Sequence, residues 1–387
     1  MSYSLVEVHD PQRVRDFLRF PTLLFANEPD YVGVPSAVEM AIFDPKNNKR
    51  CQHLKVRRWL VYEEKIAVGR IAAFLHPRPA LDEKAGALGF FDCIDSISVA
   101  AMLFNAAESY LQELGCELVD GPIQPGENDQ FWGLLVQGKG RPSFGMNWHP
   151  PYYHDLFKHF GYQPYYEQLT NYLDLSQPLP DRFFKIAAWV CQKPDVSFLH
   201  LNKKRLPGFA SDLAEVFNHA WTNFENFQPK TQQQILQEWY RFKPFIREDL
   251  VWFAYVRNQP AGFMVVLPDL NELLAKQKSG PQWLRNFRLL LASKYHRPSR
   301  LKIVAMGVHE SYQRFGLESG LIYHAYKQVE KHYPEVTEVE LAWVGGFNEK
   351  MLAIHKAAGA SPFRVHLTLR KYFDAVREVK KFSIQKA

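Results

Sequence analysis

The chain has 387 residues, of which 47% are apolar and 23% charged, and its formal net charge is +6. This length and apolar content suit two globular domains. No apolar run is long enough to span a bilayer, so no transmembrane helix is expected. The mild positive charge is spread along the chain, and it neither requires nor excludes a nucleic-acid partner.

The N-terminus and the cysteines indicate a cytoplasmic protein. The first residues, Met1-Ser-Tyr-Ser-Leu-Val, lack the basic and apolar segments of a secretory leader. The four cysteines, Cys51, Cys93, Cys116 and Cys191, have neither metal-binding nor redox spacing. We therefore expect reduced structural cysteines and no metal site.

The first half of the chain alternates strands and helices. A strand over residues 3–8 precedes a helix that begins with Asp10 as cap and Pro11 in the first turn. Residues 20–50 are rich in proline and asparagine and are expected to form a long loop. The later elements of this half are predicted as strands at 54–62, 65–74 and 88–94, a helix at 99–115, a strand at 117–120, a helix at 150–161 and a strand at 165–175.

The second half repeats this succession. Its predicted elements are a strand at 196–202, helices at 208–220 and 231–240, strands at 250–257, 260–267 and 301–308, a helix after Gly316, a strand at 338–343, a helix at 349–358 and a strand at 363–372. A boundary near 177–194 divides the chain into domains 1–180 and 181–387. The alternation indicates α/β domains with helices on the faces of a sheet.

Residues 301–329 carry the strongest functional pattern. An apolar strand is followed by a loop with one glycine and by an amphipathic helix. Such a tight turn leaves the first helical amides unpaired at the positive end of the helix dipole. This arrangement is typical of an anion seat, usually for phosphate.

Residues 308–318 resemble the acyl-CoA-binding loop of the GNAT acyltransferases, Q/R-x-x-G-x-G/A. Gln313 and Gly316 match this motif, whereas Glu318 replaces its final small residue. The whole chain also resembles a bacterial family of tandem-GNAT proteins. The resemblance implies two tandem GNAT-like domains, each a mixed twisted sheet flanked by helices.

Residues 348–359 are similar to a second GNAT signature, N-x-x-A-x-x-x-Y-x-x-x-G. Asn348 and Gly359 match, and His355 stands at the tyrosine position. The resemblance implies that the second domain binds acetyl-CoA or another acyl-CoA as co-substrate. The residues that it assigns to this binding are Met306, Gly307, Val308, Gln313, Arg314, Phe315, Gly316, Leu317, Glu318, Ser319 and Asn348.

The first half lacks such a seat. At the corresponding loop, residues 92–100 contain two carboxylates and no glycine. Carboxylates repel phosphate, and a tight turn favours glycine. We therefore expect a degenerate first domain that shapes the substrate site or only supports the second domain.

Two residues are candidates for catalysis. By resemblance, the backbone amides of Met306 to Val308 would hold the thioester, and His355 would give the leaving thiolate a proton, since imidazole titrates near neutral pH. The alternative for His355 is quiet packing on its helix. Glu272 is a candidate general base. Glu318 either points to solvent or occupies the phosphate seat, which would make the protein a pseudoenzyme.

The acceptor site is expected in two regions. Asn223 and Asn226 lie between the first two helices of the second half, and Asp269 and Asn271 begin an insertion. The alternative for Asp269 is that it only caps a helix. The insertion, residues 273–300, is amphipathic and basic. It is interpreted as a membrane-surface, tRNA-contacting or lid segment, or as a helix packed on the domain.

The sequence thus predicts an acyl-CoA-dependent N-acyltransferase that moves an acyl group, expected to be acetyl, directly to a small-molecule or peptide amine. The alternatives are an aminoacyl-tRNA-dependent transferase and a non-catalytic binding or scaffold protein.

Overall fold

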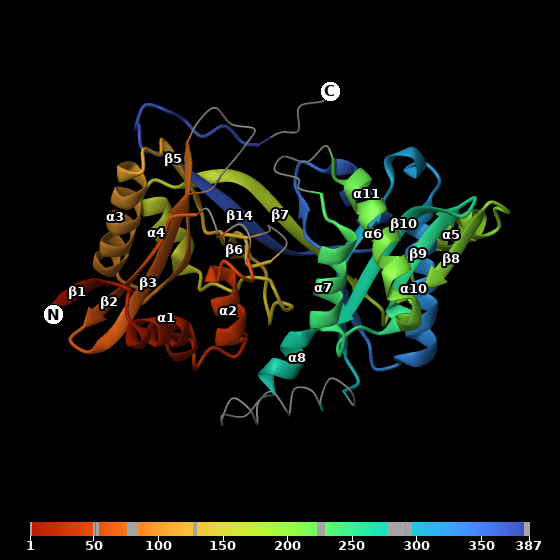
Figure 1. Ribbon diagram of the computed structural model, residues 1–387, viewed down its shortest axis with the longest axis horizontal. Coiled ribbons are helices and arrows are strands. Elements are labelled where there is room, and N and C mark those ends of the chain that lie inside the picture. Colours follow the sequence, from red (N-terminus) through yellow and green to blue (C-terminus); the bar gives the residue numbers. More distant parts are fainter. Residues whose placement is uncertain are drawn as a thin grey trace. The chain divides into compact units, whose positions relative to one another are not determined.

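The computed structural model describes residues 2–48, 51, 54–75, 84–126, 130–222, 229–276, 291 and 296–382. The chain forms two compact units (Figure 1). Unit 1 comprises residues 1–169, 345–347 and 364–387, and unit 2 comprises residues 170–344 and 348–363. Each unit therefore includes residues from both halves of the sequence. The sequence boundary at residue 180 stays a prediction.

Unit 1 contains most of the first half of the chain. Its elements are β1 (Tyr3–Glu7), α1 (Pro11–Leu24), α2 (Ser36–Phe43), β2 (Val56–Glu63), β3 (Ile66–Leu75), β4 (Ala85–Cys93), α3 (Ile97–Glu113), β5 (Leu118–Gly121), β6 (Leu134–Gln137), α4 (Tyr152–His159) and parts of β7 (Gln163–Asp174) and β14 (Ser361–Tyr372). The strand order is β1-β2-β3-β4-β5-β14, with β6 beside β14. The β4–β5 pair is parallel, and β14 pairs antiparallel with β5.

The predicted long loop over residues 20–50 is wrong, because α1 continues to Leu24 and α2 follows. Pro21 lies inside α1 and has no N–H to donate to the carbonyl of Phe17. That carbonyl instead accepts a hydrogen bond from Arg70 Nη1 at 2.8 Å. A tertiary contact thus satisfies the group that proline leaves unpaired, and the helix continues.

Unit 2 contains most of the second half. Its elements are the end of β7, α5 (Asp181–Cys191), β8 (Val196–His200), η2 (Lys203–Arg205), α6 (Leu206–Ala220), α7 (Gln232–Phe242), η3 (Glu248–Leu250), β9 (Val251–Val256), β10 (Gln259–Pro268), α8 (Leu270–Ala275), β11 (Arg300–Val308), η4 (Glu310–Tyr312), α10 (Leu317–His332), β12 (Glu338–Glu340) and α11 (Glu349–Ala357). The strand order is β7-β12-β11-β10-β9-β8, and β13 (Val344–Gly345) pairs with β7. The β11–β12 pair is parallel, and the pairs β7–β12, β10–β11, β9–β10 and β8–β9 are antiparallel.

The sheet of unit 2 is covered on both faces, as alternating apolar side chains require. Along β9, Trp252 and Ala254 join a buried cluster with α5 and α10. Val251 and Phe253 point the other way, into a cluster with α6 and α7. Figure 1 shows the two pairs of helices on either side of β9 and β10. Among the described residues, no helix is both long enough and apolar enough to cross a membrane.

Candidate active site

The sheet of unit 2 opens beside β11. Only Arg300 to Lys302 of this strand pair with β12, whereas β11 continues to Val308 alongside β10. Beyond Glu340, the Leu341 amide donates to the Asn171 carbonyl of β7 at 2.9 Å. In the described part of the chain, no strand pairs with the β12-facing edge of β11 after Lys302. Backbone groups of this edge are thus available to a ligand.

A bulge lies at the opening. Val265 of β10 pairs with Ala305, but its neighbour Val266 pairs with Ile303, so Val304 is an extra residue on β11. A bulge bends a strand and increases its local twist. The bend therefore coincides with the place where β11 leaves β12.

The loop after β11 leads directly into the N-terminus of α10. Gly316 caps this helix with φ 77°, a left-handed conformation that favours glycine. Glycine has no side chain that could cap the helix. The amides of Ser319 and Gly320 both donate to the Gly316 carbonyl, at 3.1 and 3.4 Å. No backbone partner among the described residues is recorded for the first two helical amides, those of Leu317 and Glu318. The predicted anion seat is therefore present as a structural feature.

Glu318 lies inside this seat and is only 8% exposed. Burial raises the pKa of its carboxyl group, while its own backbone N–H and the charge of Lys350 act in the opposite direction. Lys350 Nζ also donates to Gln313 Oε1 at 2.7 Å. Gln313 and Glu318, both predicted to bind acyl-CoA, are thus linked to one lysine that the sequence did not point to.

Helix α5 adds an aromatic wall next to Gly316. A Cβ atom at Gly316 would lie 3.8 Å from the indole ring of Trp189, which is 55% exposed. Lys193 Nζ lies 3.5 Å from the centre of that ring and 5.0 Å from the ring of Phe315. Sequence reasoning missed Trp189 and Lys193, although a spacing of four residues, about one helical turn, is a signal for such a contact.

His355 lies on α11, beside the opening of the sheet. It is 4% exposed, and its Nδ1 lies 3.0 Å from Nδ2 of Asn171. The amide group of Asn171 donates, so Nδ1 accepts and the ring proton is on Nε2. Burial lowers the pKa of His355 to about 4, so the ring is neutral at pH 7 rather than titrating near neutrality. Asn348 caps α11 by accepting from the Met351 amide at 3.1 Å.

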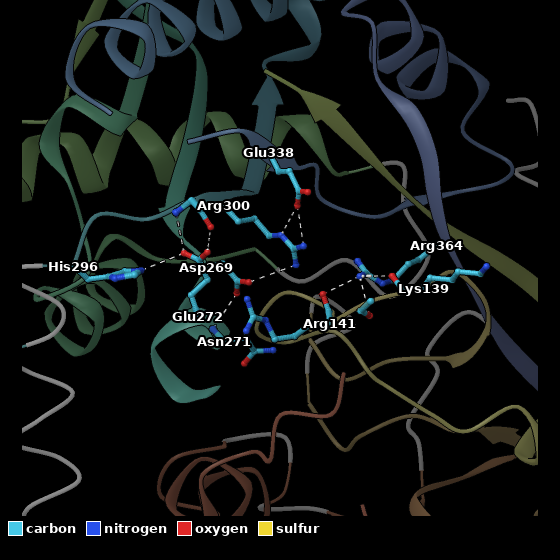
Figure 2. Close-up of polar contacts among 11 residues, drawn as sticks. Lys139, Arg141, Asp269, Asn271, Glu272, His296, Arg300, Glu338 and Arg364 are labelled. Atoms are coloured by element: carbon cyan, nitrogen blue, oxygen red, sulfur yellow. Dashed lines mark hydrogen bonds and ion pairs between the residues drawn. The ribbon is translucent and has the colours of Figure 1, made fainter. Parts of the chain in front are cut away.

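Asp269 and Asn271 are buried at the other end of β11. Asp269 caps α8, since its Oδ1 accepts from the Asn271 amide at 3.0 Å, and its Oδ2 lies 3.8 Å from Arg300 Nη1. Arg300 also contacts Glu338 at 2.8 Å (Figure 2). These groups form a polar network around the start of β11.

Glu272 belongs to the same network. Its Oε2 lies 3.2 Å from Nε2 of His296 (Figure 2). The same oxygen accepts from the Ser299 amide at 3.1 Å, and Oε1 accepts from the Ser299 hydroxyl. Burial would raise the pKa of Glu272, but these hydrogen bonds outweigh it and the pKa is lowered. A carboxylate held in this way is a weak base.

The two predicted catalytic residues are not brought together. Glu272 contacts Ser299, directly before β11, whereas the predicted thioester-binding residues end the same strand at Val308. Extended backbone rises ~3.3 Å per residue, so more than about 20 Å separates the two ends. His355 contacts Asn171, whose carbonyl accepts from the Leu341 amide, whereas Glu272 contacts Ser299 and His296.

The acceptor residues Asn223 and Asn226 lie outside the described residues, as does most of the basic insertion 273–300. The preceding Trp221 is described and packs against β11. A Cβ atom on Gly307 would lie 2.4 Å from the Trp221 ring. Glycine at position 307 therefore permits close contact between the end of α6 and the strand.

The corresponding turn in unit 1 is closed. Ser96 caps α3 with its side chain, which accepts from the Val99 amide at 3.4 Å. Asp92, at the end of β4, bonds Arg70 Nε at 2.7 Å, and Arg70 also pairs with the buried Glu39 of α2. Burial raises the pKa of both carboxyl groups. Ser96 thus caps the start of α3 and Arg70 holds Asp92, so this turn has no uncapped helix start like that of α10.

Comparison with known proteins agrees with this geometry. Residues 213–360 match the model of the acetyltransferase (GNAT) family. The structure of a tandem GNAT protein from the clavulanic acid biosynthesis pathway superposes with a TM-score of 0.56 at 13% identity. The superposition covers 96% of this chain and 98% of that protein's chain. A GCN5-related N-acetyltransferase from Sphaerobacter thermophilus superposes with a TM-score of 0.52 at 12% identity, covering 98% of both chains. The protein therefore has the α/β fold of tandem GNAT proteins, as the sequence predicted.

Two relatives match nearly the whole sequence. Bacterial ceramide synthase of Caulobacter vibrioides is 26% identical over 95% of this chain and 97% of its own length. Protein YghO of Escherichia coli is 25% identical over 91% of this chain and 90% of its own length. The resemblance to the GNAT family is thus supported by the family model over residues 213–360 and by the fold over nearly the whole chain, and these likenesses do not define the acyl group or the acceptor.

Proposed function

We propose that this protein is an acyl-CoA-dependent N-acyltransferase whose reaction takes place in unit 2. The observation that carries the proposal is the opening of β11 from β12, which leads directly to the uncapped start of α10. An extended thioester arm fits along an open strand edge, and its phosphates fit the helix start. Reduced cysteines suit the cytoplasm as the location, and the four described cysteines are free thiols.

Transfer is direct in this proposal. A neutral amine nitrogen attacks the thioester carbonyl carbon, the C–S bond breaks, and the nitrogen proton leaves to solvent. Backbone amides among Met306, Gly307 and Val308 stabilise the carbonyl oxygen as it gains charge. His355 donates a hydrogen bond from Nε2 to the departing sulfur, because its Nδ1 accepts from Asn171. Glu272 takes no part, since it lies at the other end of β11.

We further propose a long-chain amine as acceptor and a fatty acyl group as donor. The relative named bacterial ceramide synthase matches nearly the whole chain. A ceramide is a fatty amide of a long-chain amino alcohol, so its synthesis is an N-acylation of the kind that unit 2 supports. The alternative is acetyl transfer, which the sequence predicted. Comparing acetyl-CoA with palmitoyl-CoA as donors distinguishes the two.

Thiol release tests the proposal. The purified protein is incubated with acetyl-CoA or palmitoyl-CoA and with a short-chain amine, a peptide amine or a long-chain amino alcohol, and the amide product is identified by mass spectrometry. We expect amide formation with palmitoyl-CoA and the long-chain amine. Amide formation only with acetyl-CoA would refute the fatty-acyl assignment. Absence of any amide, with acyl-CoA bound, would favour a binding or scaffold protein.

A further inference from the structure

We propose that Glu318 contacts the pyrophosphate of the bound donor as a neutral, protonated carboxyl group. Binding of each donor molecule is then accompanied by the uptake of one proton from solvent. This inference rests on the proposed function, because it concerns the same acyl-CoA seat. The residue takes the place of the glycine or alanine that ends the GNAT loop motif. It therefore changes how phosphate is held.

Two observations place Glu318 in the seat. It occupies the first turn of α10, a helix that begins at the left-handed Gly316 without a side-chain cap. It is also more than nine-tenths buried. Among the described residues, no side chain forms a hydrogen bond or an ion pair with its carboxyl group. A buried carboxyl group normally has a partner, so this one is placed for a ligand.

A phosphate that enters the seat competes with Glu318 for the same amides. Two anions in contact cannot both keep their charge in a buried site, and the weaker acid takes up a proton. A pyrophosphate diester is a much stronger acid than a carboxyl group, so the proton goes to Glu318. The carboxylate becomes COOH, no other bond changes, and the new O–H donates to a phosphate oxygen.

The charged neighbours do not remove this conflict. From α11, the charge of Lys350 lowers the pKa of Glu318, and its ammonium already donates to Gln313. From α5, the side chains that face Gly316 are the uncharged Ile186, Trp189 and Val190. Lys193 lies beyond them, over the Trp189 ring. One lysine faces two anions, and protonation of Glu318 balances the charge.

Titration calorimetry with dephospho-CoA tests the inference. This probe keeps the pyrophosphate but lacks the 3′-phosphate, whose own titration near neutral pH would hide the effect. Binding heats are measured at pH 6, 7 and 8 in buffers of different ionisation enthalpy, which gives the number of protons taken up. For the native protein we expect uptake that approaches one proton at pH 8 and affinity that falls by up to about tenfold per pH unit.

Glu318→Gln keeps the shape and the donor group but cannot titrate. We expect no proton uptake, pH-independent affinity, and binding about tenfold tighter than native at pH 8. The matched control is Glu349→Gln, the same change at an exposed position in the first turn of α11, which should behave as native. If the glutamine variant does not fold, Glu318→Ala restores the family's small residue and should also bind without pH dependence.

Equal proton uptake and equal pH dependence in the native protein and Glu318→Gln would overturn the inference and leave the proposed function standing. Weaker binding by Glu318→Gln at every pH would also overturn it, because the ionised carboxylate would then be the required form. If neither protein binds dephospho-CoA or CoA at any pH, both the inference and the proposed function fail.

Discussion

Replacing His355 by phenylalanine separates catalysis from packing in unit 2. If the Nε2–H group stabilises the departing thiolate, its removal lowers kcat by about 10²–10³-fold, the usual loss for one pre-aimed donor. Affinity for the acyl-CoA should stay unchanged, because the contact forms only as the C–S bond breaks. The native kcat should show no inflection from this residue between pH 6 and 8, since burial lowers the pKa of His355 to about 4.

The same substitution has a calculable effect on stability. At pH 7 it leaves the buried amide of Asn171 without its partner, which costs about 1–3 kcal/mol. As pH falls, the unfolded chain protonates its histidine near pH 6.5, whereas the folded chain resists until about pH 4. The native protein therefore loses roughly 3 kcal/mol between these two values, and phenylalanine does not. The two stability curves should cross at about pH 5.

Denaturant unfolding of both proteins between pH 4 and 8 measures the difference, and thiol release measures kcat. A stability difference that does not vary with pH would refute the assignment of a buried neutral ring. Unchanged turnover would remove His355 from the mechanism and leave it a packing residue. Asn171→Ala is the matched variant, since it removes the partner but keeps the imidazole.

Three further substitutions test the packing of the two units. Arg70→Met in unit 1 should destabilise the protein by about 3–5 kcal/mol at pH 7, because two buried carboxylates lose their cation. This loss of stability should be smaller at pH 5, where the carboxylates become protonated, and denaturant unfolding at the two pH values measures it. Gly307→Ala should cost about 1–3 kcal/mol in thermal unfolding, since its methyl group would strike Trp221. Gly316→Ala should cost about 1–2 kcal/mol because of the left-handed backbone, and it should weaken acyl-CoA binding in titration calorimetry. An unchanged midpoint in any of these would contradict the packing described.

The sequence predicted elements whose signals are local. The cap at Asp10, the apolar strand before the loop and the glycine that starts α10 all appear as expected. Helix α2 was missed because proline and asparagine around it favour a loop. The predicted strand at 338–343 ends at Glu340, where the chain leaves β11 but still bonds β7 through the Leu341 amide. The loss of one of its two neighbouring strands is not encoded in any local pattern.

The site was predicted only as far as it is continuous in sequence. The loop from Gln313 to Ser319 forms one surface because it is one turn. Trp189 reaches it only after α5 packs beside α10, and Lys350 only through its bond from α11 to Gln313, so no spacing rule connects them. Glu272 and His355 were both predicted as acid–base groups of one domain, but Glu272 bonds Ser299 whereas His355 bonds Asn171.

Hydrogen–deuterium exchange with and without a bound acyl-CoA tests the central claim most directly, namely that unit 2 holds the donor between the open edge of β11 and the start of α10. We predict protection of backbone amides in peptides that cover residues 304–320, with no change in peptides that cover residues 92–100 of unit 1. Protection at residues 92–100, or no protection at 304–320 under saturating acyl-CoA, would contradict the account.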